Sequence, residues 1–399
     1  NQRDVIEIYE RELGRDSDRY SYSVMRLGVI LFDQRRHEDA VAAYDEALQI
    51  KQRMGTMDDS AGIDLLGIYS NVLSSMGELE KAAEMADRAI ELSIRTLGEG
   101  HPSTIIRMHN RGLIASSSGD LELATEIFTR TVELGRQTWP EHHPQIAFMV
   151  GGLGSMKRRS GDFDEARQLY DEKAESTRIV MGEESIDYVS ALRARGFLLI
   201  DMAKYAEAED TFRDALELLA QLDALDHYHY PVVNLGLGMT LNRRGRFAEA
   251  EQQFMEALKN RDRMSTTTQQ ITQSELAEAM SGQGRTSEAE TLFSDTLQDA
   301  REQVGDDSRT LTRQLIRIAA HYRREGDPET ARQYIDDAVR IADANWPRSN
   351  WQSALIHAEF GSILVAQGDR VAGRRELEAA ASALEEVFGQ DDPRVIASR

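Results

Sequence analysis

The chain repeats one pattern every 42 residues, and this period limits its possible folds more than any other feature. In each copy a small residue is followed four positions later by an aromatic or other apolar residue, as in Ala40 and Tyr44. A long internal period predicts tandem structural repeats, each packed on its neighbours, and such an array escapes the size limit of a single core. The first members of the nine copies are Ala40, Ala82, Ala124, Ala166, Ala208, Ala250, Ala289, Ala331 and Gly373, spaced by 42 residues except for one step of 39.

Two further series predict that each copy consists of two helices joined by a tight turn. Glycine at the turn suits a helix end, where a positive φ penalises other residues, and small residues within helices let two helix axes approach closely. A small residue stands twelve positions before each first member, at Gly28, Ser70, Gly112, Gly154, Gly196, Gly238, Ala277, Ala319 and Gly361. Seven copies carry a glycine five positions before the first member, at Gly77, Gly119, Gly161, Gly245, Gly284, Gly326 and Gly368.

This pattern resembles the tetratricopeptide repeat. The resemblance lies in Leu27-Gly28 on the first helix and in Ala40, Tyr44 and Ala47 on the second. The usual repeat has about 34 residues, and the extra residues here fall in a connection that reads Leu-Gly-x-x-His-Pro, as at residues 97–102. This longer variant is similar to the repeat of kinesin light chains. It is also common in bacterial signalling proteins that join such arrays to kinase, protease or nucleotide-binding switch domains.

The resemblance implies an all-α fold, a right-handed α-solenoid of about nine helix-turn-helix repeats with partial repeats at both ends. We expect a single solenoid over residues 1–399, with residues 1–17 as the trailing half of a preceding repeat and residues 393–399 as the start of a further helix. Such partial repeats favour a segment of a larger protein, and exposed end repeats also permit self-association. The repeats are expected at 18–59, 60–101, 102–143, 144–185, 186–227, 228–266, 267–308, 309–350 and 351–392.

The step of 39 residues lies between the sixth and seventh repeats. The segment 259–273 is polar and lacks the His-Pro connection of other repeats. Two interpretations are open: a bend or hinge in the array, or a shortened loop without further consequence.

Composition excludes several classes of function. The chain has 47 Lys and Arg against 69 Asp and Glu, a formal charge of −22, and this acidity disfavours binding to nucleic acid or to anionic lipid. It has no cysteine, which excludes disulfides, cysteine nucleophiles and cysteine-based zinc sites. No apolar run approaches the roughly 20 residues of a membrane span. We therefore expect a cytoplasmic protein that binds neither nucleic acid nor membrane.

No residues stand out as a catalytic or cofactor site. The Gly-rich run 151–154 lacks the preceding strand of a phosphate-binding loop. The histidine pairs His142-His143 and His227/His229 fall at the His-Pro connections and lack a third ligand at tetrahedral spacing. We expect no enzyme activity, no cofactor and no metal.

The remaining candidate is the inner face of the array, since the resemblance implies that first helices line it and bind peptides. Its arginines favour an acidic or C-terminal-carboxylate peptide, with Phe148, Phe197 and Met239 supplying apolar pockets. The alternative is that these arginines pair with carboxylates of neighbouring helices. The candidate partner-binding residues are Asn71, His109, Phe148, Arg158, Arg159, Arg193, Phe197, Met239, Asn242, Arg243, Arg323 and Arg324.

Two functions stay open at this stage. The first is a non-catalytic scaffold that holds a partner polypeptide in its concave groove. The second is a sensory or regulatory arm of a multidomain signalling switch whose catalytic part lies outside this chain.

Overall fold

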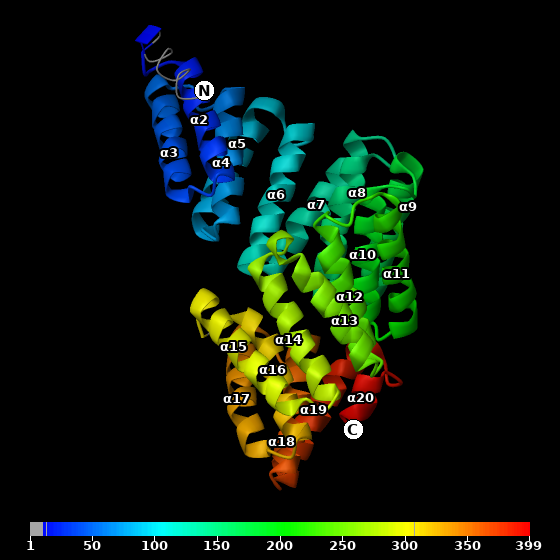
Figure 1. Ribbon diagram of the computed structural model, residues 1–399. Coiled ribbons are helices and arrows are strands. Elements are labelled where there is room, and N and C mark those ends of the chain that lie inside the picture. The colour runs from blue at the N-terminus through cyan, green and yellow to red at the C-terminus, as the bar shows by residue number, and fades with distance from the viewer. Residues whose placement is uncertain (1–10, 13, 307) are drawn as a thin grey trace. The chain divides into compact units, whose positions relative to one another are not determined.

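The computed structural model describes residues 11–12, 14–306 and 308–399, and every regular element in this part of the chain is a helix. Figure 1 shows them as successive hairpins. The expected trailing half-repeat at residues 1–17 lies mostly outside the described residues. The all-α repeat architecture predicted from the 42-residue period is confirmed.

The helices follow one another in pairs, each a first and a second helix joined by a short turn. The first and second helices of the successive hairpins are α2 (Asp18–Asp33) and α3 (His37–Met54), α4 (Ser60–Ser75) and α5 (Leu79–Leu97), α6 (Pro102–Ser118) and α7 (Leu121–Thr138), α8 (Pro144–Ser160) and α9 (Phe163–Met181), α10 (Ile186–Asp201) and α11 (Tyr205–Gln221), α12 (His229–Arg243) and α13 (Phe247–Lys259), α14 (Thr266–Gly282) and α15 (Thr286–Val304), α16 (Thr312–Arg324) and α17 (Pro328–Asn345), and α18 (Trp351–Ala366) and α19 (Arg370–Phe388). The short helix α20 (Pro393–Ala397) follows them.

The turns within the hairpins have the backbone conformation that their glycines predict. All seven turn glycines have positive φ, for example 85° at Gly119. In the two hairpins that lack the glycine, Arg35 and Ala203 stand at the same position and adopt φ values of 60° and 56°. The turn geometry is therefore kept even where a side chain makes it unfavourable.

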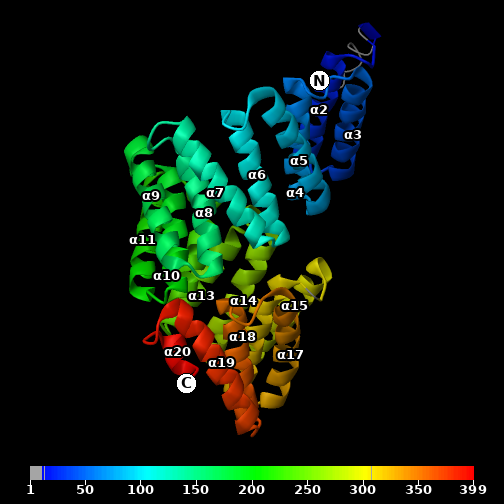
Figure 2. The same cartoon turned by 180° about the vertical axis from the view of Figure 1, so that it is seen from behind.

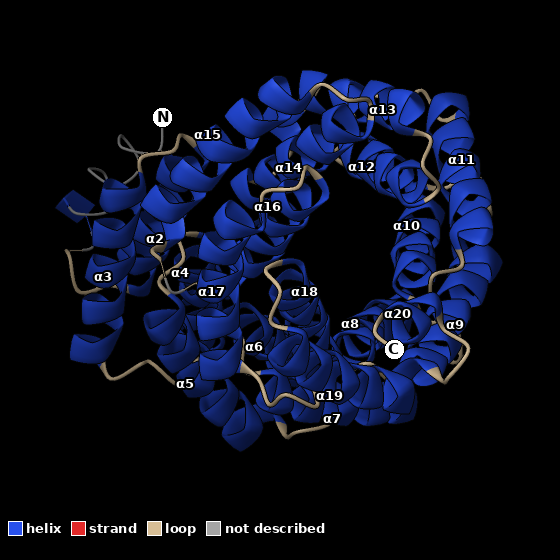
Figure 3. Cartoon of the chain, turned by 90° about the horizontal axis from the view of Figure 1, so that it is seen from below, coloured by secondary structure: helices blue, strands red, loops and turns tan. Residues whose placement is uncertain are grey.

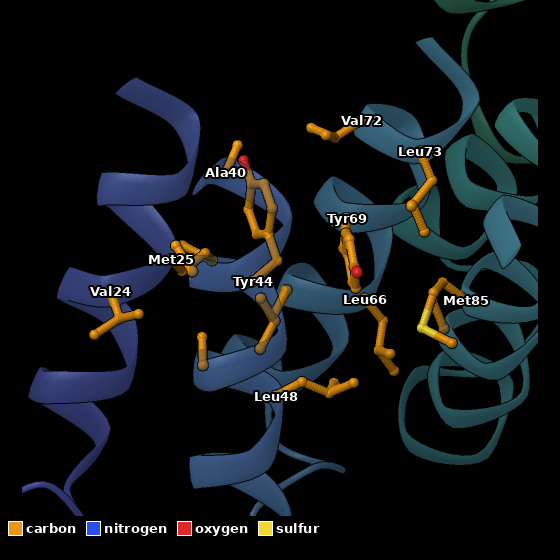
Figure 4. Packing of buried hydrophobic residues seen from close by; sticks show 14 of the residues in the cluster. Val24, Met25, Ala40, Tyr44, Leu48, Leu66, Tyr69, Val72, Leu73 and Met85 are labelled. Atoms are coloured by element: carbon orange, nitrogen blue, oxygen red, sulfur yellow. The ribbon is translucent and has the colours of Figure 1, made fainter. Parts of the chain in front are cut away.

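The small residues of the first helices face the large residues of the second. A Cβ added at Gly196 would lie 2.6 Å from the ring of Phe212, and one added at Gly112 would lie 2.7 Å from Phe128. Figure 4 shows the core near the start of the array, where Tyr44 lies against Tyr69 of the next hairpin. Their rings are stacked at 5.2 Å between centroids. Large side chains thus fill the space that the glycines leave open.

The shortened repeat is accommodated by its second helix. Helix α13 has 13 residues, whereas α11 has 17. A 3₁₀ turn, η1 (Arg261–Arg263), precedes α14 by two residues, and the Gln269 side chain donates a 2.9 Å hydrogen bond to the Arg261 carbonyl. The missing residues thus shorten a helix end and its connection.

The chain divides into two compact units, residues 1–156 and 157–399, and the boundary falls inside α8. The single period of the sequence does not predict this division. The first unit has a continuous core that runs from α2 to α6 and includes Tyr44, Leu66 and Ile114.

No helix among the described residues is long and apolar enough to cross a membrane.

The second unit is closed by contacts between its first and last helices. Phe163 at the start of α9 packs on Trp351 of α18 and on Phe388 of α19, with ring centroids 5.7 and 5.1 Å apart. The Arg394 guanidinium of α20 donates a 2.7 Å hydrogen bond to the Asp201 carbonyl at the end of α10, and both Figures 1 and 2 show these helices side by side. Repeat arrays are held mainly by contacts between neighbours, and the sequence pattern predicts only those.

Candidate functional site

The first helices of the second unit form a continuous wall. Each of α10, α12, α14, α16 and α18 contacts the next one in the series. Within this unit Figure 3 shows them on the inner side, with α11 and α13 outside. In this unit the first helices therefore lie on the inner side.

A buried carboxylate links three successive helices of this wall. Glu275 of α14 is fully buried and pairs with Arg317 of α16. The Asn242 amide of α12 donates a 2.9 Å hydrogen bond to the Glu275 carbonyl, and Arg243 of α12 lies 3.7 Å from the Glu275 carboxylate. A second carboxylate, Glu278, accepts from Arg243 at 3.1 Å. These contacts hold neighbouring repeats together from the inside.

Several predicted partner-binding arginines are paired with carboxylates of neighbouring repeats. Arg158 lies 3.3 Å from Asp201, and Arg323 donates a 2.6 Å bond to Glu359. Together with Arg243, they follow the alternative interpretation, in which arginines bridge adjacent helices. Arg324 is exposed, and Arg159 is partly buried.

The structure places three candidate residues in the interior rather than on a surface. Met239 and Asn242 are buried on α12, where Met239 joins the apolar core and Asn242 holds Glu275. His109 of α6 is buried between Phe128 and Phe148, at ring-centroid distances of 4.8 and 4.6 Å.

In the first unit, Phe148 and Asn71 are accessible. Phe148 is 52% exposed although it packs on His109, and Leu113 of α6 is 41% exposed. Asn71 of α4 is exposed as well. Burial lowers the pKa of His109 to about 4, so this apolar surface rests on a neutral ring at physiological pH.

Arg193 of α10 differs from Arg158, Arg243 and Arg323 because no described carboxylate forms an ion pair with it. Its Nε is buried and has no hydrogen-bond partner. Burial lowers its pKa, and the charge of Arg158 lowers it further, while Tyr228 and Tyr170 act in the opposite direction. Phe197, one helical turn later, is partly buried and packs edge-on against Phe212 at 5.3 Å.

Two neighbours of Arg193, Lys173 and His229, are not among the predicted partner-binding residues. Burial, followed by the charge of Arg193, lowers the pKa of Lys173 to about 8, and Asp187 opposes the shift. Burial, then Arg193, His227 and Lys173, lower the pKa of His229 to about 3. A signal for Lys173 was present, because it occupies the position that Ala47 and its equivalents fill with a small residue.

Among the described residues, no group of three or more His, Asp or Glu side chains is placed to hold a metal ion. The histidines of the predicted connections have local roles instead. The Nδ1 atoms of His143 and His227 each accept a backbone N–H two residues later, at 3.2 and 3.3 Å. The arrangement offers ion pairing and apolar contact as its available chemistry.

Comparison with known proteins identifies the repeats. Family models described as tetratricopeptide repeat match residues 6–54, 64–137, 144–221 and 189–263, which together make up more than half of the chain. No curated protein sequence matches the chain.

Similar folds occur among solved structures at low sequence identity. A Rap protein complexed with competence and sporulation factor is 12% identical, with a TM-score of 0.63 over 93% of this chain and 99% of that one. The Rap conjugation gene regulator of plasmid pLS20, in complex with the Phr* peptide, is 14% identical, with a TM-score of 0.59 over 92% and 96%. A putative kinesin light chain from Podosopora anserina is 15% identical, with a TM-score of 0.46 over 50% and 95%. The chain belongs to the tetratricopeptide-repeat family.

Proposed function

We propose that this chain is a non-catalytic interaction scaffold that binds a partner polypeptide on the inner wall of its second unit. The observation that carries the proposal is the state of Arg193 on α10 of that wall, a partly buried side chain whose Nε is buried without a hydrogen-bond partner. An acidic side chain or a terminal carboxylate of a polypeptide would complete it, because guanidinium and carboxylate pair in a planar, bidentate geometry.

Ion pairs within the chain reduce the number of predicted arginines that are available to a partner. Arg158, Arg243 and Arg323 already have carboxylate partners at 3.3, 3.1 and 2.6 Å. A polypeptide that bound them would have to compete with Asp201, Glu278 or Glu359. Arg193, which lacks such a competitor, is therefore the first contact that we assign to the partner, and Phe197 beside it supplies apolar surface.

The molecules bound in two of the similar structures support this proposal. One Rap protein is complexed with competence and sporulation factor, and the other is in complex with the Phr* peptide. Arrays of this fold thus accommodate such ligands.

Binding of an acidic peptide library tests the proposal. Fluorescence anisotropy with labelled acidic and neutral peptides would be compared for the wild type, Arg193→Glu and the control Arg195→Glu. Arg195 lies on the same helix, α10, and is exposed. We expect selective binding of acidic peptides, at least tenfold weaker in Arg193→Glu and unchanged in Arg195→Glu. Equal affinities for the two variants would reject the proposed surface.

A regulatory arm of a larger switch is the second candidate, and the closing contact of the second unit favours it. The contact of Phe163 with Trp351 and Phe388 joins helices that are far apart in the chain. A polypeptide on the inner wall would change the strength of this contact if it prefers the open or the closed arrangement. Hydrogen exchange of α9 and α18 with and without a bound peptide measures this coupling, and unchanged exchange would count against the regulatory role.

A further inference from the structure

Three contacting helices of the second unit bring two cationic side chains and a neutral histidine together. Lys173 comes from α9, Arg193 from α10 and His229 from the first turn of α12, and α10 contacts both other helices. The Lys173 ammonium donates a 3.2 Å hydrogen bond to the Ser190 hydroxyl, one turn before Arg193 on α10. This bond ties the Lys173 side chain of α9 to α10, close enough to Arg193 for the two charges to interact.

His229 completes the cluster and is buried among aromatic rings. It is only 1% exposed, and its ring lies 4.1 Å from that of Tyr228 and 4.9 Å from that of His227. Its backbone N–H is fixed by His227 Nδ1 at 3.3 Å. The Nδ1 of His229 is buried and has no hydrogen-bond partner.

The charges around the cluster do not balance. Arg193 acts on both Lys173 and His229, and Arg158 acts on Arg193. The carboxylate that acts on Lys173 is Asp187, which is itself exposed, and the other groups that face the cluster are His227, Tyr170 and Tyr228. Like charges held together away from water are unfavourable, and buried cations are normally paired. Such an arrangement is typical of functional sites.

We propose that Lys173, Arg193 and His229 form a binding site for a single oxyanion group, a carboxylate or a phosphate. The guanidinium offers a planar pair of donors, the ammonium adds a compact charge, and the Ser190 hydroxyl can turn to donate. In the proposed function this group is carried by the bound polypeptide, so the inference rests on that function for the source of the anion. The site itself is testable with small anions.

The low proton affinity of Lys173 gives the site a distinctive signature. With a pKa near 8, this ammonium is about half protonated at pH 8. An anion beside it favours the charged form and raises its pKa, so binding at pH 8 draws about half a proton from the buffer. An ordinary surface lysine is already protonated at this pH and gives no such uptake.

Isothermal titration of acetate and, separately, of inorganic phosphate at pH 8 tests the inference. Tris and triethanolamine serve as buffers because both are cationic and release different heats on ionisation. We expect binding of at least one anion with proton uptake, which acetate reports most directly because it does not titrate at this pH. Arg193→Gln is expected to weaken binding at least tenfold, whereas Arg195→Gln leaves it unchanged.

A conservative variant separates the site from a merely structural effect. Lys173→Arg keeps the positive charge but does not titrate near pH 8, so binding persists while the proton uptake is largely lost. Absence of binding by both anions, equal affinities for Arg193→Gln and Arg195→Gln, or binding without proton uptake in the wild type would each overturn the site. If small anions bind as expected but acidic peptides do not, the site stands and the proposed polypeptide-binding function fails.

Discussion

The indole Nε1 of Trp351 donates a 3.2 Å hydrogen bond to the backbone carbonyl of Arg159, 192 residues earlier in the chain. This bond joins α18 to the end of α8 within the second unit. A Cβ at Gly161, in the turn that follows, would lie 3.0 Å from both Trp351 and Val387, so the two segments approach as closely as the backbone allows. The closing contact is therefore a specific, packed interface.

Replacing Trp351 by alanine should open this interface without unfolding the repeats. Truncating a buried aromatic residue costs roughly 3–5 kcal/mol, and here the loss falls on contacts between distant repeats. We expect amide exchange in the first turn of α9 and in α20 to accelerate at least tenfold, while α12 to α15 keep their protection. The control is Trp346→Ala, since Trp346 packs locally with the core around Ile341. Faster exchange throughout the second unit in Trp351→Ala would contradict a separable closing contact.

Two glycines should respond in opposite ways to the same substitution. Gly196→Ala places a methyl group 2.6 Å from Phe212, and overpacking of this kind costs typically about 1–3 kcal/mol. Gly67→Ala, also within a helix, meets nothing closer than 3.8 Å, so the better helix propensity should stabilise by roughly 0.5–1 kcal/mol. Urea unfolding followed by far-UV circular dichroism measures both. Destabilisation by both substitutions would show that the contact with Phe212 is not the cause.

Buried His109 should make the first unit sensitive to acid. Its folded pKa of about 4 lies below the ordinary histidine value of 6.5, so between these pH values the unfolded chain binds the proton more readily. Stability is then lost as the pH falls from about 6.5 towards 4, by about 2 kcal/mol between pH 7 and pH 5. His109→Leu should remove this part of the pH dependence, and substitution of the exposed His37 by Gln should not. Equal pH dependence in wild type and His109→Leu would refute the assignment.

The helices and turns were predictable from sequence because they depend on local chemistry. The turn at Gly119 has a positive φ, which favours glycine, and the same turn recurs along the chain with the 42-residue period. The closing contact was not predictable, since it depends on small rotations that accumulate over several repeats. The pairing of the candidate arginines was partly hidden as well. Arg243 and Arg323 pair with Glu278 and Glu359, which follow them by 35 and 36 residues. Each arginine lies at the end of a first helix, and its partner lies on the first helix of the next hairpin.

The Glu275 cluster provides the last prediction, because it shows how the inner wall resists opening. Glu275 is fully buried and faces Arg317, whose side chain is 8% exposed, so neither charge can turn to water. Glu275→Gln keeps the shape but leaves the Arg317 charge without its closest partner, and breaking a buried pair in this way costs about 3–5 kcal/mol. The control is Asp299→Asn on the exposed face of α15.

The same substitution also tests the electrostatics of Glu278. Burial alone would raise the pKa of Glu278, but Arg243, Arg317 and Arg324 lower it to about 2. Without the Glu275 charge, Glu278 is the carboxylate that remains close to both Arg243 and Arg317. These arginines should keep Glu278 ionised, and its ion pairs should still hold α12, α14 and α16 together in part. We therefore expect urea unfolding of Glu275→Gln at a lower midpoint, while amide exchange remains slower in α12 than in the double variant Glu275→Gln/Glu278→Gln. A midpoint equal to that of Asp299→Asn would show that the cluster does not stabilise the wall.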